Sequence, residues 1–141
     1  MRETTAAPPL ARSRAFPGNP ARAREARRFL AAILDHNPVA EDAVLCLSEL
    51  AANAAIHSRS GQPGGQFSVR AELGGGLLRV EVRDQGGPWT WPPADDAGRG
   101  RGLLIVAALA RAWGRDGDTA TGWTVWFEME CPPGQHPLEQ R

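Results

Sequence analysis

The chain has 141 residues, and its 16 arginines balance 16 acidic residues, so its formal net charge is zero. This length suits one domain with a substantial core, and the balanced charge argues against direct binding of nucleic acid or of an anionic membrane surface. Because the chain contains no lysine, a lysine-dependent phosphate loop and a Schiff-base enzyme are both excluded.

The cysteine and hydropathy patterns indicate a cytosolic protein. Cys46 and Cys131 lie far apart and lack the spacing of metal ligands, so we expect two free thiols. No segment has the apolar core of a signal peptide, or the roughly 20 apolar residues that a membrane helix needs. We therefore expect a cytoplasmic protein that does not bind membranes.

In chain order, the sequence predicts a loose tail over residues 1–9, one domain over residues 10–131 and a second loose tail over residues 132–141. The domain is expected to begin with a short edge strand over residues 10–16. Asn19-Pro20 then combines an N-cap residue with a proline suited to the first helical position, and an apolar stripe at helical spacing follows, formed by Ala26, Leu30, Ile33 and Leu34. The arginines of this helix are expected to form a solvated face, with a partner-binding surface as the alternative.

A second helix is predicted after Asn37-Pro38, which repeats the same start signal. The segment from Val39 to about His57 is rich in Ala and Leu and contains neither Gly nor Pro. Because it is apolar nearly all round, we expect a long, buried helix.

The remaining elements are shorter. Two alternating segments, residues 66–73 and 77–84, predict a hairpin around three consecutive glycines. Residues 85–99 are expected to be irregular. We then expect a helix over 101–113, a turn-rich link over 115–122 and a last strand over 123–130. This order predicts an α+β two-layer sandwich, with helices on one face of a mixed, largely antiparallel sheet.

The long helix carries a polar stripe that a buried helix does not need. Cys46, Glu49, Asn53 and His57 are spaced so that they share one face. A buried carboxylate or amide costs several kcal/mol unless it is paired. The stripe therefore forms either a structural hydrogen-bond network or a binding site.

Two further motifs follow along the chain. Asp84 ends a strand and precedes Gln85-Gly86-Gly87, so its carboxylate could accept a bond from an exocyclic amine such as that of adenine, while the glycines admit a flat ring. A plain turn is the alternative. The segment from Gly98 to Leu103 is glycine-rich and precedes a helix, where backbone N–H groups can hold phosphate oxygens.

The order of these motifs resembles the ATP-binding domain shared by DNA gyrase, the ninety-kilodalton heat-shock chaperones, sensor histidine kinases and mismatch-repair ATPases. Within that superfamily the chain is most similar to the small anti-sigma-factor serine/threonine kinases of bacteria. LSELAANAAIHS matches their N box, VRDQGG and GRGRGLLIV match their two glycine boxes, and GWTVWFEME matches their last strand. The resemblance covers roughly residues 14–130 and implies a Bergerat-type ATP-binding fold.

The resemblance also implies a role for each matching residue. Glu49 would be the catalytic base toward the attacking hydroxyl, Asn53 would ligate Mg²⁺, and Asp84 would bond the adenine amine. The other implied nucleotide-binding positions are Gly86 and Thr124 at the base, and His57, Gly98, Gly100 and Gly102 at the phosphates, with Leu103 as a further cofactor-binding position.

The function implied by the resemblance is transfer of the ATP γ-phosphate, with Mg²⁺, to a Ser or Thr of an anti-sigma antagonist, sequestration of a sigma factor, or both, in a homodimer. Pro88 stands where the first glycine box commonly has its second Gly, and Trp89 and Trp91 follow it. This departure favours an alternative, a nucleotide-binding interaction module with little or no kinase activity. A third reading is an interaction domain with relic motifs.

Overall fold

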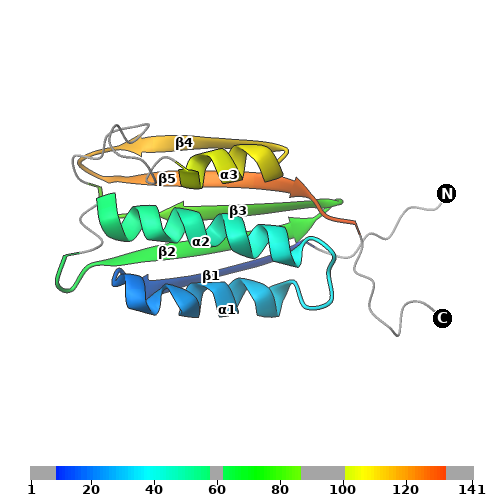
Figure 1. The fold of residues 1–141 in the computed structure, drawn as a ribbon, viewed down its shortest axis with the longest axis horizontal. Coiled ribbons are helices and arrows are strands. Elements are labelled where there is room, and N and C mark those ends of the chain that lie inside the picture. Colours follow the sequence, from blue (N-terminus) through cyan, green and yellow to red (C-terminus); the bar gives the residue numbers. More distant parts are fainter. Residues whose placement is uncertain (1–8, 58–61, 87–100, 133–141) are drawn as a thin grey trace.

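A computed structural model gives the fold, and it describes residues 9–57, 62–86 and 101–132. The described residues form five strands, three α-helices and one 3₁₀ turn, η1 (Figure 1). Their bounds are β1 Leu10–Pro17, η1 Pro20–Arg22, α1 Ala23–Ile33, α2 Ala40–His57, β2 Gln66–Gly74, β3 Leu77–Arg83, α3 Arg101–Leu109, β4 Ala112–Asp118 and β5 Gly122–Glu130. The predicted tails fall almost wholly on residues 1–8 and 133–141, outside the described part, so they stay a prediction.

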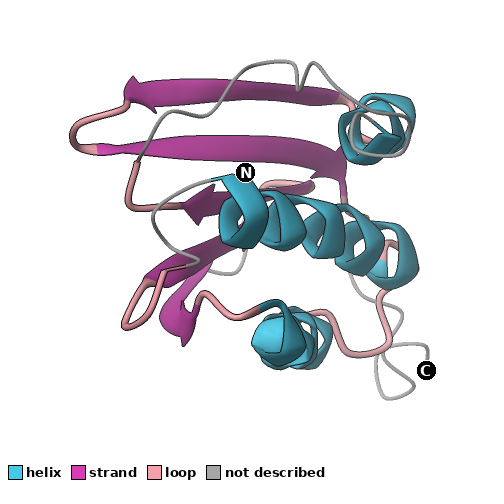
Figure 2. Cartoon of the chain, turned by 60° about the vertical axis from the view of Figure 1, so that its left-hand side comes forward, coloured by secondary structure: helices cyan, strands magenta, loops and turns pink. Residues whose placement is uncertain are grey.

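The strands form one sheet in the order β1-β2-β3-β5-β4. Every pairing between described strands is antiparallel, where the sequence predicted a mixed, largely antiparallel sheet. The three helices lie on one face of this sheet (Figure 2). The predicted α+β two-layer sandwich is thus confirmed, with a sheet more regular than expected.

The predicted helix starts are confirmed by their caps. Asn19 accepts a hydrogen bond from the backbone N–H of Ala21 at 2.8 Å, and Pro20 takes the first position of η1, which leads into α1. The side chain of Asn37 likewise accepts from the N–H of Val39 at 3.0 Å, just before α2. Both caps satisfy donors that a helix start leaves unpaired.

The predicted hairpin is also confirmed. Gly75 and Gly76, between β2 and β3, have φ values of +62° and +78°. Two consecutive positive φ angles belong to the tight turns whose twist matches paired strands.

One predicted element is wrong. The helix expected over residues 101–113 ends at Leu109, and residues 112–118, which we expected to be partly helix and partly link, form strand β4. Trp113 pairs with Phe127 on β5. Pairing with a long apolar strand overrides the weak local preference of a segment that contains glycine and aspartate.

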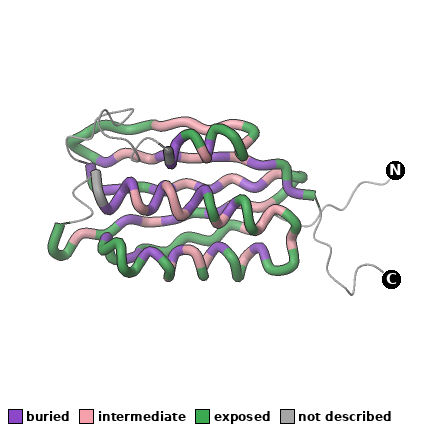
Figure 3. The backbone as a smooth tube through the Cα atoms, viewed as in Figure 1, coloured by how far each residue is buried: buried purple, intermediate pink, exposed green. Residues whose placement is uncertain are grey.

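The hydrophobic core lies between the helices and the sheet, and buried positions recur along both the helices and the strands (Figure 3). It combines alternate residues of the strands, such as Val69, Val80 and Phe127, with one side of α2, including Leu47. Helix α2 lies between α1 and α3 (Figure 1), which explains its apolar composition. Leu45 is an exception to the expected all-round burial, since it is 43 % exposed. Among the described residues, no helix is both long and apolar enough to cross a membrane.

Candidate functional site

The amide of the polar stripe is buried without a complete set of partners. Asn53 is 8 % exposed, and its Nδ2 has no hydrogen-bond partner among the described residues. Glu49, one turn earlier on α2, is partly exposed. An unpaired buried donor costs about 1–3 kcal/mol. The hydrogen-bond network of the stripe is therefore incomplete at Asn53. A ligand with a hydrogen-bond acceptor would remove the energetic cost of the unpaired donor.

Helix α3 begins directly against Glu49. A Cβ atom placed on Gly102 would lie 2.8 Å from Glu49 Oε1 and 3.2 Å from Glu49 Cβ, so this approach depends on glycine. The first N–H groups of a helix have no acceptor within the helix, and they favour an anion. The fold thus brings the polar stripe of α2 beside the glycine-rich start of α3, although the two are distant in sequence.

Asp84 follows β3 and is 5 % exposed. Its Oδ1 accepts hydrogen bonds from the backbone N–H groups of Gly86, at 2.7 Å, and Trp123, at 2.9 Å. Gly86 has a φ of +84°, a conformation that favours glycine. These two bonds hold the carboxylate of Asp84 in one orientation at the end of β3.

The residue of β5 that lies beside Asp84 is Trp123, whereas the resemblance assigned the base contact to Thr124. Thr124 pairs with Arg83, and paired residues point to the same face of a sheet. Arg83 and Asp84 are neighbours on the strand path, so they point to opposite faces. The backbone N–H of Asp84 donates to the carbonyl of Trp123 at 2.9 Å, which places Trp123 opposite Asp84. Thr124 and Asp84 thus point to opposite faces of the sheet, and the contact of Thr124 with the base stays a prediction.

Arg115 and Trp123 were missed by the sequence reasoning. The guanidinium of Arg115 lies over the indole of Trp123, 3.9 Å from the ring centroid, and the indole Nε1 is buried with no hydrogen-bond partner in the described part of the chain. Burial lowers the pKa of Arg115, and the nearby charge of Asp84 opposes this shift. The period-two alternation that places Val125 on the core face of β5 also places Trp123 there, and this signal was available in the sequence.

The other predicted positions divide into three groups. Gly98 and Gly100 lie outside the described residues, as does the Trp- and Pro-bearing segment around Pro88. His57 ends α2, and its side chain is not described. Leu103 packs into the hydrophobic core with 6 % exposure, so only its backbone N–H, in the first turn of α3, can serve a ligand.

The donor set can be tested against Mg²⁺. No three His, Cys, Asp or Glu residues of the described ranges are close enough to hold a metal ion among themselves. Mg²⁺ commonly takes only one or two protein ligands and completes its shell with water and phosphate oxygens. The buried amide of Asn53 fits this use, because its oxygen suits the ion while its unpaired NH₂ suits an adjacent phosphate oxygen.

Cys46, the apolar end of the stripe, is chemically inert. Burial, together with the charges of Asp42 and Glu49, raises the pKa of its thiol to about 12. A thiol of this kind stays protonated at neutral pH and is a poor nucleophile. Of the stripe residues whose side chains the structure describes, Glu49 and Asn53 therefore remain as the chemically active ones.

Comparison with known proteins gives one match. The family model of the histidine kinase-like ATPase domain matches residues 16–129, from the end of β1 almost to the end of β5. No curated protein matches the chain. The matched range includes Glu49, Asn53, Asp84 and Trp123.

Proposed function

This chain belongs to the histidine kinase-like ATPase domain family, which is typical of anti-sigma-factor Ser/Thr kinases, and from that premise we propose that it is an ATP-dependent regulatory protein of the anti-sigma type. In this proposal it transfers the γ-phosphate of ATP to a Ser or Thr of an anti-sigma antagonist, sequesters a sigma factor, or does both. ATP and Mg²⁺ bind between α2, the start of α3 and the end of the β3–β5 pair.

The observation that carries the proposal is the meeting of α2 and α3. Asn53 holds a buried amide nitrogen that has no hydrogen-bond partner among the described residues, and Glu49, one turn away, lies against Gly102. An unpaired buried amide does not stabilise a core that has only a structural role. A triphosphate with its metal ion would supply acceptors for the amide and negative charge for the helix start.

Each part of the site has its own task in this proposal. Asp84 accepts a hydrogen bond from the exocyclic amine of the base, and the backbone of α3 binds phosphate oxygens. Mg²⁺, bound in part through Asn53, neutralises phosphate charge. Glu49 accepts the proton of the attacking hydroxyl, which is the role of a carboxylate in phosphoryl transfer to Ser or Thr.

Binding is tested with Asn53→Ala. Isothermal titration calorimetry with Mg-ATP should show binding to the wild-type chain and none to Asn53→Ala, whose melting temperature without ligand should stay close to that of the wild type. Asn37→Ala is the matched control, since Asn37 caps α2 away from the site, and it should keep the wild-type affinity. Equal affinity in Asn53→Ala would contradict the assigned role.

Transfer is tested with Glu49→Gln. Incubation with radiolabelled ATP, Mg²⁺ and an anti-sigma antagonist from the same organism should label the antagonist. Loss of a general base lowers a rate by about 10²–10⁴-fold, so Glu49→Gln should bind ATP but label poorly. Glu41→Gln, in the first turn of the same helix, should label normally. If the wild-type chain binds ATP and never labels the antagonist, the nucleotide-binding module without kinase activity is the correct function.

A further inference from the structure

A groove separate from the candidate site runs between β1 and α1. Its volume is about 670 Å³. Its apolar lining comes from both elements, and charged side chains complete it. The apolar residues are Leu10, Phe29, Ala32 and Ile33, and the charged residues are Arg12, Arg14, Glu25 and Arg28.

The strand register places Arg12 and Arg14 of β1 on the face of the sheet that carries the core, which is unusual for charged residues. Arg12 pairs with Ala71, and Arg14 pairs with Val69. Ala71 and Val69 are 1 % and 0 % exposed, so the face that is core on β2 carries exposed arginines on β1. The hydrophobic core does not explain charge at these positions.

The groove carries a net positive charge even when the ion pair between Glu25 and Arg22 is taken into account. Among the described residues of the lining, Glu25 is the only carboxylate. Its Oε2 is 2.7 Å from the Nε of Arg22, and Arg22 lies outside this described lining. The hydrogen bond from Arg22, and more weakly the charges of Arg14 and Arg28, lower the pKa of Glu25. Arg12, Arg14 and Arg28 therefore face one carboxylate that Arg22 already neutralises, and the groove favours an anionic occupant.

The backbone of β1 offers a second means of binding. β1 stands at an edge of the described sheet, so one row of its N–H and C=O groups pairs with β2 and the other row is open to a further strand. A second copy of this chain is disfavoured in the registers that centre on residues 12 to 14. Antiparallel pairing of two β1 strands about Ser13 would set Arg12 of one copy opposite Arg14 of the other, and like charges directly opposite are destabilising.

We propose that β1 and α1 form a docking site for an extended acidic segment of a partner protein. The segment pairs with the open edge of β1 and places carboxylates against Arg12, Arg14 and Arg28. Because alternate side chains of a strand point to opposite faces, the carboxylates occupy every second position of the segment. The same arginines that repel a second copy thus select an acidic partner.

The experiment uses the full chain and a fluorescein-labelled peptide of eight residues that alternates Glu and Val, which matches the length of β1 (8 residues). Fluorescence anisotropy should show binding that weakens with added salt. The double variant Arg12→Glu/Arg14→Glu should bind this peptide at least about tenfold more weakly, since close charge pairs across an interface are worth about 1.5 kcal/mol or more. It should instead bind the matched peptide in which Lys replaces Glu.

Two controls separate docking from a general charge effect. Arg24→Glu changes the same charge on α1 at an exposed position outside the lining, and it should change the affinity less than twofold. A Glu-Val peptide with N-methylated amides cannot pair with a strand and should bind much more weakly. Equal binding of the Glu peptide by the wild type and the double variant, or no binding by the wild type, would overturn the proposal.

Self-association is measured separately by analytical ultracentrifugation. The wild-type chain should not dimerise through this groove. A wild-type dimer that the double variant disrupts would assign the groove to a second copy and overturn the acidic partner. None of these variants changes a residue of the candidate nucleotide site, so these outcomes are independent of whether the chain binds ATP.

Discussion

Asn53 and Trp123 each bury a nitrogen donor without an acceptor among the described residues. An unpaired buried donor reduces stability, and such costs persist where function needs the group. Trp123 lies beside Asp84, which follows β3, and Asn53 lies one turn after Glu49 on α2. Buried donors without acceptors are the pattern expected of a site that a polar ligand completes.

The indole of Trp123 is predicted to contribute to nucleotide binding. Trp123→Ala should weaken Mg-ATP binding about tenfold, because base–aromatic stacking is worth about 1–3 kcal/mol. Trp126→Ala is the matched control. Trp126 pairs with Glu81 on the other face of the sheet and lies under Arg79 at 4.3 Å, so its loss should leave the affinity unchanged. Calorimetric titration of both variants measures the difference, and equal affinities would exclude a contact between Trp123 and the base.

The sequence was enough to place Asp84 after a strand and the polar stripe on a helix, because strand ends and helical spacing are local features. The family resemblance carried the base contact to Thr124, and Trp123 received no role. The face of a strand residue depends on alternation, and alternation places Trp123 on the core side with Val125. Arg115 was not predictable in this way, because its strand was not predicted.

At the scale of elements, the largest error concerns residues 110–118. The apolar run of α3 continues through Ala110, so the helical pattern has no clear local end. β4 contains Gly114 and Gly117, and it is a strand because β5 offers it a partner along its full length. Long-range pairing of this kind leaves little signal in the segment itself.

The packing of α2 against α3 predicts a specific effect of Gly102→Ala. The new methyl group would crowd Glu49, and overpacking of this kind costs typically about 1–3 kcal/mol. The variant should melt at a lower temperature, and labelling of an antagonist should fall more than Mg-ATP affinity because the carboxylate is displaced. The double variant Gly102→Ala/Glu49→Ala should recover most of the lost stability, since removing the carboxylate removes most of the clash. If the stability losses of the two single variants add up in the double variant, the contact between residue 102 and Glu49 does not determine stability.

At the scale of the whole molecule, the order of elements was enough to predict the two-layer sandwich, because few arrangements bury the faces of three helices and one antiparallel sheet. The spatial neighbours of the site were harder to predict. The contact of Gly102 with Glu49 depends on how two helices sit on the sheet, and no local pattern encodes that placement.

The buried thiols predict how the stability of the whole chain depends on pH. The pKa of Cys46 is raised from 9.0 to about 12, so the folded chain keeps the thiol protonated while the unfolded chain ionises it above about pH 9. The contribution of Cys46 to stability is complete below pH 9 and is lost as the pH rises towards 12. Urea unfolding at pH 8 and pH 10 should show this loss, and Cys46→Ala should show a smaller one. The same pH dependence in both proteins would assign the effect to other groups.

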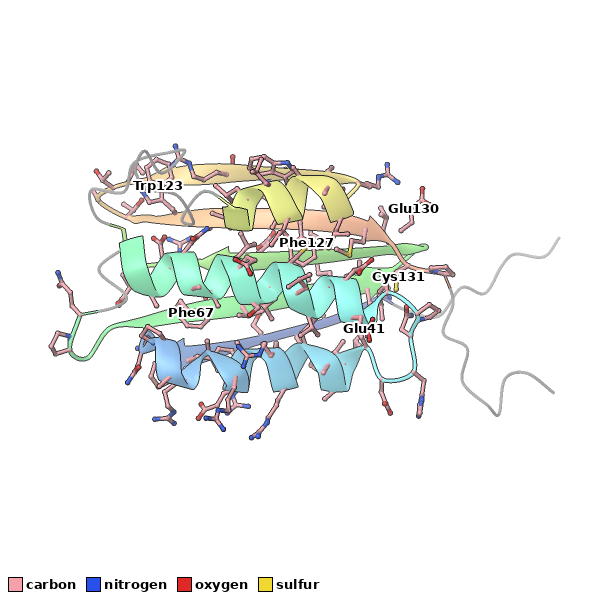
Figure 4. All side chains as sticks on the ribbon, in the orientation of Figure 1. Glu41, Phe67, Trp123, Phe127, Glu130 and Cys131 are labelled. Carbon is pink, nitrogen blue, oxygen red and sulfur yellow. The ribbon has the colours of Figure 1, made fainter. Side chains whose placement is uncertain are left out.

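The antiparallel register shows which residues lie at each of the two opposite ends, or poles, of the sheet. Leu10 pairs with Leu73 and Glu130 pairs with Leu77, so both sit at the pole opposite Asp84, and Trp123 and Glu130 lie at opposite ends (Figure 4). A tether joined before β1 or after β5 would hold the molecule by one pole and present the other to solution. On a sensor surface that holds the protein by either tether, the end of the sheet with Asp84 would face the solution and stay accessible to small molecules.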